Sequence, residues 1–287
     1  MSSAKEITTV VKTGDKPGTL FLVSTPIGNL GDMTFRAVEV LSSAALIVAE
    51  DTRHSRRLLD HFRIGTPVSS YHEHNEAKET PRLIARLQAG DAIALISDAG
   101  TPLVSDPGAR LTRAAIDAGI RVVPVPGASS VMAALVGSGM PLESFTFFGF
   151  LPRKGAQRAA IIRDVVTSRA TTVLFEAANR VSATLADLAA AGAADREAIV
   201  ARELTKQFEE FKRGTIEDLK QTYGDSEPRG EVVLVISGAE EREASEEELN
   251  AAARELRASG KQPREVMKEL TALGASRNVA YRLAHSD

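Results

Sequence analysis

Apolar and amphipathic segments alternate along the first half of the chain. Short apolar runs at residues 20–24, 46–49, 92–96 and 121–125 are typical of buried β-strands. The stretches between them, at residues 34–42, 55–62, 80–89 and 109–118, have the spacing of amphipathic helices. Strands that alternate with helices in this way predict a parallel sheet with helices on both of its faces.

The pattern changes after residue 126. A helix rich in small residues is predicted at 131–139, and then strands at 145–150, 172–175, 198–203 and 232–237 with helices at 157–167, 180–191 and 215–222. Residues 240–248 are strongly acidic, and three short helices are predicted at 250–258, 263–273 and 276–284. We therefore expect a flexible tail (1–17), an α/β domain (18–126), a second α/β domain (127–238), and an acidic linker with a C-terminal helical domain (239–287).

Loops rich in Gly and Pro follow the predicted strands of the first domain. Residues 24–30 follow the first strand, residues 97–108 the third, and residues 126–130 the fourth. Ligands of open α/β sheets bind beyond the carboxyl ends of the strands, where such loops let the backbone come close to a ligand. The loops therefore predict a small-molecule site, although the same residues also serve as plain turn formers. None of them has the spacing of a nucleotide-phosphate loop.

Composition limits the range of functions. The chain has 287 residues with a formal net charge of −3 and no cysteine, so a disulfide, a thiolate metal site and a cysteine nucleophile are excluded. The apolar runs fall short of the roughly 20 residues that a membrane span needs, so we expect a cytoplasmic protein without membrane contact. The slightly acidic balance argues against general nucleic-acid binding but leaves room for a local basic patch.

Residues 50–57 place charges of both signs directly after a predicted strand. Arg53, Arg56 and Arg57 suit contacts with phosphates. The alternative is an ordinary helix start with Thr52 or Ser55 as the N-cap.

Two further polar segments are candidates for chemistry. His72 and His74 would face the same side of an extended segment, but without a matched third ligand we expect hydrogen bonds within a loop, or contacts to substrate, rather than a metal. Glu203 and Lys206 follow a predicted strand of the second domain and could act in proton transfer, or form a surface ion pair. Basic residues of the last helices, such as Arg277, could contact RNA or simply face solvent.

Several segments, in order along the chain, resemble the small-subunit ribosomal RNA methyltransferases of the tetrapyrrole methylase-like superfamily. The resemblance covers residues 18–238, and its segments are residues 18–30, 49–54, 72–76, 97–108, 149–152, 201–206 and 230–234. It implies two α/β domains with the methyl donor, S-adenosyl-L-methionine, in the cleft between them. It also implies a homodimer that methylates the ribose 2′-hydroxyl of a cytidine in the decoding region of the small subunit.

The resemblance also suggests roles for individual residues. Donor contacts are expected from Pro26, Gly28, Asp98, Gly100, Thr101, Pro102, Val104, Ser129, Ser130, Phe175, Gly230 and Glu231. Thr101 stands where the wider superfamily has Asp, and Phe175 and Glu176 occupy the strand end that often lies beside the donor's adenine. We expect a polar rim around the acceptor hydroxyl from Glu203, Lys206, Asp51 and Arg53, and RNA contacts from Arg53, Arg56, Arg57, His72, His74, Arg153, Lys154 and Arg277.

Two other functions remain open from the sequence. A methyltransferase for a tetrapyrrole-like small molecule would share this fold and donor. A non-catalytic module that binds the ribosome would keep the fold without binding the donor.

Overall fold

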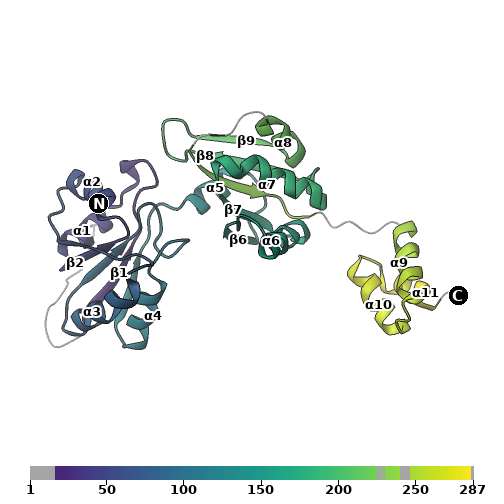
Figure 1. Cartoon of the computed structure of the whole chain (residues 1–287), viewed down its shortest axis with the longest axis horizontal. Coiled ribbons are helices and arrows are strands. Elements are labelled where there is room, and N and C mark those ends of the chain that lie inside the picture. Colours follow the sequence, from purple (N-terminus) through teal and green to yellow (C-terminus); the bar gives the residue numbers. More distant parts are fainter. Residues whose placement is uncertain (1–16, 225–227, 229, 240–245, 286–287) are drawn as a thin grey trace, which may run out of the picture.

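The computed structural model of the chain describes residues 17–224, 228, 230–239 and 246–285. All but residue 17 of the expected tail, and most of the acidic segment, lie outside the described residues. The described chain forms two sheets and a group of C-terminal helices (Figure 1).

The first sheet is entirely parallel, with the strand order β3-β2-β4-β1-β5. Its strands are β1 (Thr19–Val23), β2 (Leu46–Ala49), β3 (Val68–Ser70), β4 (Ile93–Ile96) and β5 (Arg121–Val125). Helices α1 (Phe35–Ser43) and α2 (Thr52–His61) pack on one face, and α3 (Glu76–Gln88) and α4 (Ala109–Asp117) pack on the other. Two separate apolar clusters bury β2 and β4 from both sides, which explains their uninterrupted apolar sequence. The predicted parallel sheet with two covered faces is confirmed.

The second sheet is mixed, with the order β6-β7-β10-β8-β9. Its strands are β6 (Phe145–Phe150), β7 (Thr171–Ala177), β8 (Glu197–Arg202), β9 (Glu210–Thr215) and β10 (Glu231–Ile236). Only β6 and β7 are parallel. Helices α6 (Ala156–Thr167), α7 (Val181–Leu188) and α8 (Ile216–Gly224) cover one face, and α5 (Ser130–Ser138) packs on the other. Short turns of other helix types lie at Leu30–Asp32, Ala178–Arg180 and Ala189–Ala193.

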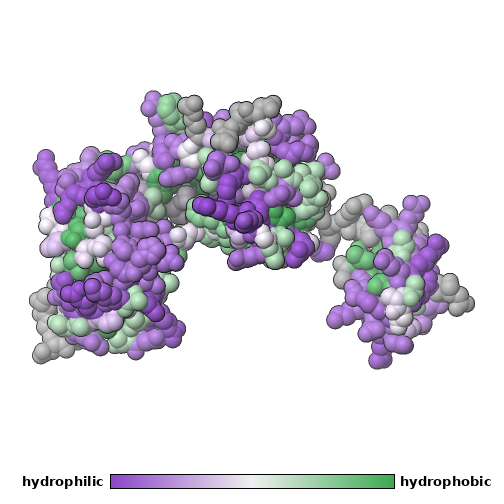
Figure 2. All heavy atoms as spheres, viewed as in Figure 1, coloured by the Kyte–Doolittle hydropathy of each residue, from purple (hydrophilic) through white to green (hydrophobic). Residues whose placement is uncertain are grey.

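The C-terminal helices α9 (Glu246–Ala258), α10 (Pro263–Ala272) and α11 (Arg277–His285) pack on one another around their own apolar cluster. In the space-filling view they form a distinct unit, and hydrophilic residues cover much of the visible surface of the chain (Figure 2). No helix in the described ranges is long and apolar enough to cross a membrane.

The structure corrects several local predictions. Helix α2 begins at Thr52, and Asp51 caps it by accepting the backbone N–H groups of Arg53 and His54, so neither Thr52 nor Ser55 is the N-cap. Helix α3 begins at Glu76, a full turn before the predicted start. The edge strands β3 and β9 were not predicted, because edge strands with few buried residues lack the apolar signal of central strands.

Candidate active site

Hydrogen bonds join the three Gly–Pro loops at the edge of the first sheet. Strand β1 lies between β4 and β5, so all three loops leave from neighbouring parallel strands. Thr25 and Gly100 exchange backbone hydrogen bonds of 2.9 and 3.0 Å. The Thr101 hydroxyl donates to the carbonyl oxygen of Ala128 over 3.2 Å. The loops therefore form one connected wall rather than separate turns.

The backbone of this wall adopts conformations that cost free energy. Gly100 has a φ of 81°, and a Cβ there would lie 3.1 Å from Ile27 Cγ2. Leu103 and Ser105 have φ values of 72° and 66° although they are not glycines. Such strain persists only where the surrounding structure enforces it, and it is concentrated at functional sites.

A cavity of about 430 Å³ opens between this wall and the second sheet. Its volume lies in the range of small-molecule sites. The part of the chain built on the first sheet (the first unit) lines it with Ile27, Asp98, Ala99, Gly100, Thr101, Val104, Ser105 and Asp106, and the start of α5 lines it with Ser129, Ser130 and Val131. The part built on the second sheet (the second unit) lines it with Phe150, Phe175, Glu176, Ala177, Ala178, Gly230, Glu231, Val232 and Val233.

Most residues expected to contact the donor lie on this cavity. They are Asp98, Gly100, Thr101, Val104, Ser129, Ser130, Phe175, Gly230 and Glu231. Pro26 and Pro102 are buried and do not line it, and Gly28 lies beneath the side chain of Lys206. Glu176, which was expected beside the donor's adenine together with Phe175, also lines the cavity, whereas sequence reasoning missed Ser105, Asp106 and Phe150. The repeated Ser-Asp pair of the loop 97–108 is the signal that could have pointed to Asp106.

Aromatic rings form part of the cavity wall contributed by the second sheet. The ring centroids of Phe150 and Phe175 lie 5.3 Å apart, and Phe147 packs edge-on against Phe175. Phe150 keeps 57% of its surface exposed, although it is a large apolar residue. An exposed ring beside a cavity is suited to contact with a flat ligand group.

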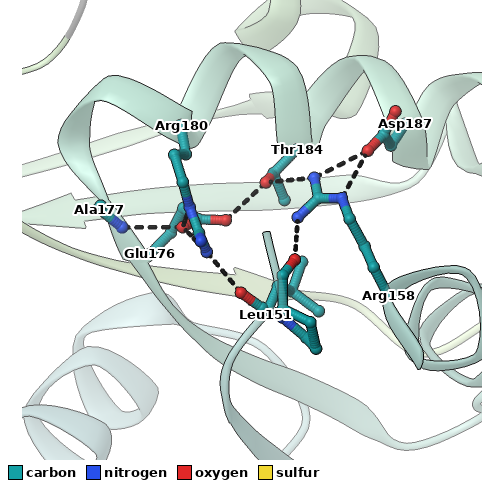
Figure 3. A network of polar contacts seen from close by, with 8 residues as sticks. Leu151, Arg158, Glu176, Ala177, Arg180, Thr184 and Asp187 are labelled. Carbon is teal, nitrogen blue, oxygen red and sulfur yellow. Dashed lines mark hydrogen bonds and ion pairs between the residues drawn. The ribbon is translucent and has the colours of Figure 1, made fainter. Parts of the chain in front are cut away.

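A buried polar network supports this wall (Figure 3). The fully buried carboxylate of Glu176 accepts hydrogen bonds from the Ala177 N–H, the Arg180 guanidinium and the Thr184 hydroxyl. Arg180 also donates to the Leu151 carbonyl oxygen over 2.6 Å. Arg158 extends the network through the Thr184 hydroxyl at 3.0 Å. The network ties the ends of β6 and β7, which carry Phe150 and Phe175, to helix α7.

Glu203, Lys206 and Glu231 form a second charged group. Lys206 Nζ lies 3.0 Å from Glu203 Oε1 and 3.3 Å from Glu231 Oε2. The hydrogen bond from Lys206 lowers the pKa of Glu203. Burial works against the charge of Lys206, but the two carboxylates outweigh it and raise its pKa. Glu203 is therefore an anion and Lys206 a cation at neutral pH.

The Lys206 side chain also reaches the first unit. Its aliphatic part crosses Gly28, where a Cβ would lie 2.4 Å from Lys206 Cγ. Gly28 has a φ of 154°, which a side chain would strain. Glycine at this position thus lets a loop of the second unit rest on the first Gly–Pro loop.

Asp51 and Arg53 lie at the start of α2, beside the loop that follows β4. The Asp51 N–H donates to Asp98 Oδ1 over 3.1 Å, and its carboxylate lies 3.7 Å from the Arg53 guanidinium. Hydrogen bonds from the α2 backbone lower the pKa of Asp51. No hydrogen bond or ion pair joins this pair to Glu203 or Lys206 in the described part of the chain.

An acidic cluster lies where α2 meets the cavity. It consists of Glu50 at the end of β2, and of Asp98 and Asp106 in the loop after β4. Burial, followed by the negative charges of Glu50 and Asp98, raises the pKa of Asp106 to about 6. Burial and the charge of Asp98 also raise the pKa of Glu50.

The basic residues expected to bind RNA are exposed. Arg53, Arg56 and Arg57 project from α2, whose first turn lies beside the acidic cluster. Arg153 and Lys154 follow β6, and Arg277 begins α11, all three exposed. Within the described residues, no hydrogen bond or ion pair joins the arginines of α2 to Arg153, Lys154 or Arg277.

His72 and His74 lie in the turn before α3 rather than in the extended segment that was predicted, and their rings are 6.0 Å apart. The predicted extended conformation is wrong, because Asn75 accepts the His72 N–H and turns the chain into the helix, although the two rings still lie close together. Among the described residues no group of His, Asp and Glu is arranged to hold a metal ion.

Comparisons with known proteins identify the family. The family model of the Tetrapyrrole (Corrin/Porphyrin) Methylases matches residues 19–220. A Synechocystis protein named "Ribosomal RNA small subunit methyltransferase I" is 49% identical over 246 residues, which are 85% of this chain and 88% of the relative. A protein of the same name from Micromonospora olivasterospora is 45% identical over 92% of this chain and 85% of its own.

Solved structures share the fold at low identity. Diphthine synthase superposes with a TM-score of 0.58 at 18% identity, over 76% of this chain and 89% of its own. Uroporphyrin-III C-methyltransferase of Thermus thermophilus, complexed with S-adenyl homocysteine, superposes with a TM-score of 0.54 at 18% identity, over 77% of this chain and 97% of its own. The chain therefore belongs to the tetrapyrrole methylase family, and within it to the group of the ribosomal RNA small subunit methyltransferase I enzymes.

Proposed function

We propose that this methyltransferase transfers a methyl group from S-adenosyl-L-methionine to the ribose 2′-hydroxyl of a cytidine in the decoding region of small-subunit ribosomal RNA. The similarity to relatives of that name, over most of the chain, carries the proposal. The protein would then act in the cytoplasm on the RNA or on the small subunit itself.

The cavity suits this donor in charge and shape. Its lining residues include acidic side chains and, among the described residues, no Lys or Arg. S-adenosyl-L-methionine carries a sulfonium and an ammonium group, both of which carboxylates attract. The rings of Phe150 and Phe175 offer an apolar surface to the adenine. When bound, the donor supplies an electrophilic methyl group.

Donor-binding roles follow from these positions. Asp98, Gly100, Thr101 and Val104 would hold the donor from the first unit, and Ser129 and Ser130 from the start of α5. Phe175, Gly230 and Glu231 would contact it from the second sheet. Pro26, Gly28 and Pro102 would act indirectly by shaping the loops.

The polar rim would act on the acceptor hydroxyl. Lys206 remains cationic, and a cation beside the 2′-oxygen would stabilise the negative charge that grows there as the proton leaves. Glu203 would hold Lys206 in position. Asp51 would fix the start of α2, from which Arg53 would reach a phosphate.

Binding to RNA would use the exposed arginines of α2 together with His72, His74, Arg153, Lys154 and Arg277. Replacing Arg53, Arg56 and Arg57 together with Gln should weaken binding to small-subunit RNA and flatten its dependence on salt concentration. The matched control is Arg113→Gln, which alters an exposed arginine of α4. An unchanged salt dependence in the triple variant would contradict the assignment.

A homodimer fits the unpartnered face of α5. Val131, Ala134 and Leu135 pack against the second sheet, whereas Met132 and Val136 lie one turn apart on the exposed side. Val136 keeps 67% of its surface exposed. Val136→Glu should therefore convert dimers to monomers in sedimentation velocity, and a monomeric wild type would contradict this part of the proposal.

The decisive experiment transfers labelled methyl groups to small ribosomal subunits from cells that lack this protein. Label on one decoding-region ribose, mapped by nuclease digestion and mass spectrometry, is the expected result. Subunits from cells that contain the protein are the control and should take up no label. Donor binding without label would favour a tetrapyrrole-like substrate, and absence of donor binding would favour a binding module.

A further inference from the structure

The cavity wall contains one carboxylate whose surroundings differ from those of the others. Among the acidic lining residues, Glu176 is held by three donors and Glu231 by Lys206. Asp98 accepts the backbone N–H of Asp51. Asp106 lines the same cavity, yet no ion pair joins it to a cation within the described ranges. The hydrogen bond that acts on it comes from the neutral Ser97 side chain rather than from a cation, so Asp106 can take up a proton without breaking an ion pair.

The position of Asp106 is as informative as its environment. Glu50, whose charge acts on Asp106, directly precedes Asp51, the residue that caps α2. Asp98 and Asp106 of the acidic cluster thus line the cavity, and Glu50 links them to the start of the helix that carries the exposed arginines. A ribose whose phosphates are bound at α2 would reach the cavity at this boundary.

Resting on the proposed function, we propose that Asp106 is the general base that accepts the proton of the ribose 2′-hydroxyl. The 2′-oxygen forms a bond to the methyl carbon while the bond from that carbon to sulfur breaks, and the electron pair of the broken bond stays on the sulfur. The proton moves from the 2′-oxygen to a carboxylate oxygen of Asp106. Positive charge on sulfur and negative charge on Asp106 disappear together, so the step balances.

The electrostatics support this role. The charged groups that face Asp106 are Glu50 after β2 and Asp98 after β4, both negative, and the Ser97 side chain opposes their effect. Their repulsion and burial make Asp106 a stronger base than an ordinary aspartate. Its pKa of about 6 still leaves it ionised above neutral pH, so that it can accept a proton and then release it to solvent. Glu203 lacks this property, because Lys206 lowers its pKa.

The central test is Asp106→Asn, which keeps the shape of the side chain and removes the base. We expect single-turnover methyl transfer to small subunits to fall about 100- to 10,000-fold, the usual contribution of a general base. Donor affinity, measured by calorimetry with S-adenosylhomocysteine, should stay within about three-fold. Asp117→Asn, an exposed aspartate of α4, is the matched control and should leave both quantities unchanged.

The pH dependence separates a base from a structural residue. Below pH 6 the wild-type rate of methyl transfer should rise tenfold per pH unit, and near pH 6 it should level off. The rate of Asp106→Asn should lack this break in its pH dependence. Glu50→Gln removes a negative neighbour, so its break should move to lower pH. A carbon-13 NMR titration of the Asp106 carboxyl group, assigned with the Asn variant, should show the same pKa without any turnover.

Each outcome decides the inference. If Asp106→Asn keeps the wild-type rate and pH profile, the role of Asp106 as general base is overturned and the proposed function stays intact. Equal losses of rate and of donor affinity in this variant would have the same meaning. Absence of labelling by the wild-type enzyme would reject the proposed function and the inference together. If Asp106→Asn does not fold, the Glu50→Gln profile decides, and an unshifted break overturns the proposal.

Discussion

Replacing Asp106 with Asn should make the protein more stable at neutral pH, because the native fold holds this carboxylate at a cost. Its pKa lies at about 6 in the folded protein, against 3.8 for an ordinary aspartate. The folded state therefore binds the proton more tightly than the unfolded state. Stability contributed by the protonated form is complete below pH 4 and is lost as the pH rises through 6.

The size of the expected stability change follows from the difference between these two pKa values. At ~1.4 kcal/mol per pH unit, the difference between the two pKa values corresponds to about 3 kcal/mol in the free energy of unfolding. Asp106 is only half-buried, so water screens part of the repulsion and about 1–2 kcal/mol is a realistic expectation. An uncharged Asn avoids this cost. The advantage of the variant should thus be small at pH 4, grow between pH 4 and 6, and stay constant above pH 7.

The assay can be confined to the first unit. The chain has no Trp and three Tyr, of which Tyr71 lies in the first unit, Tyr223 in α8 and Tyr281 in α11. In a background that carries Tyr223→Phe and Tyr281→Phe, urea unfolding followed by Tyr71 fluorescence reports on the first unit alone. A stability difference between Asp106 and Asn variants that does not change from pH 4 to pH 8 would refute the reasoning.

Three further changes test the rest of the site. Gly100→Ala should weaken donor binding at least tenfold in calorimetry, because its φ of 81° and the nearby Ile27 side chain leave no relaxed place for a Cβ. Glu176→Ala leaves Arg180 partly buried without its carboxylate and should destabilise the second unit by about 3–5 kcal/mol in urea unfolding. Phe150→Ala should reduce donor affinity several-fold with little change in melting temperature, since that ring is mostly exposed; an unchanged affinity would remove the ring from the donor site.

The fold could be predicted from the sequence wherever burial on both sides leaves an apolar run. Strands β2 and β4 are buried throughout, and each was visible as an uninterrupted apolar segment. Strand β9 was not, because it lies at the edge of its sheet and none of its residues, which include Lys212 and Arg213, is buried. Apolar residues occur where a strand is buried, so an edge strand with little burial lacks an apolar pattern in its sequence.

The residues of the candidate site likewise fall into those that local sequence signals predict and those whose roles depend on the fold. The loops after β1 and β4 were recognisable because Gly and Pro mark backbone that approaches a ligand, and such marks are local. The properties of Asp106 are not local, because Glu50 reaches it only through the pairing of β2 with β4. The role of Glu176 likewise depends on Arg180 and Thr184, which the fold of α7 over β7 brings to it. Residue types could be read from the sequence, whereas their charges and partners required the fold.

The distribution of charge explains how a chain of net charge −3 can act on RNA. Carboxylates are concentrated in and beside the donor cavity, whereas α2 presents Arg53, Arg56 and Arg57 to solvent. Under the proposed function, phosphates would be drawn to α2 and repelled by the cavity, so an RNA strand would bind beside the donor without displacing it. The ribose hydroxyl, which carries no charge, is the part of the nucleotide that can cross this boundary at least cost. A separation of charge across the start of α2 would therefore orient the substrate, which a uniformly basic surface would not do.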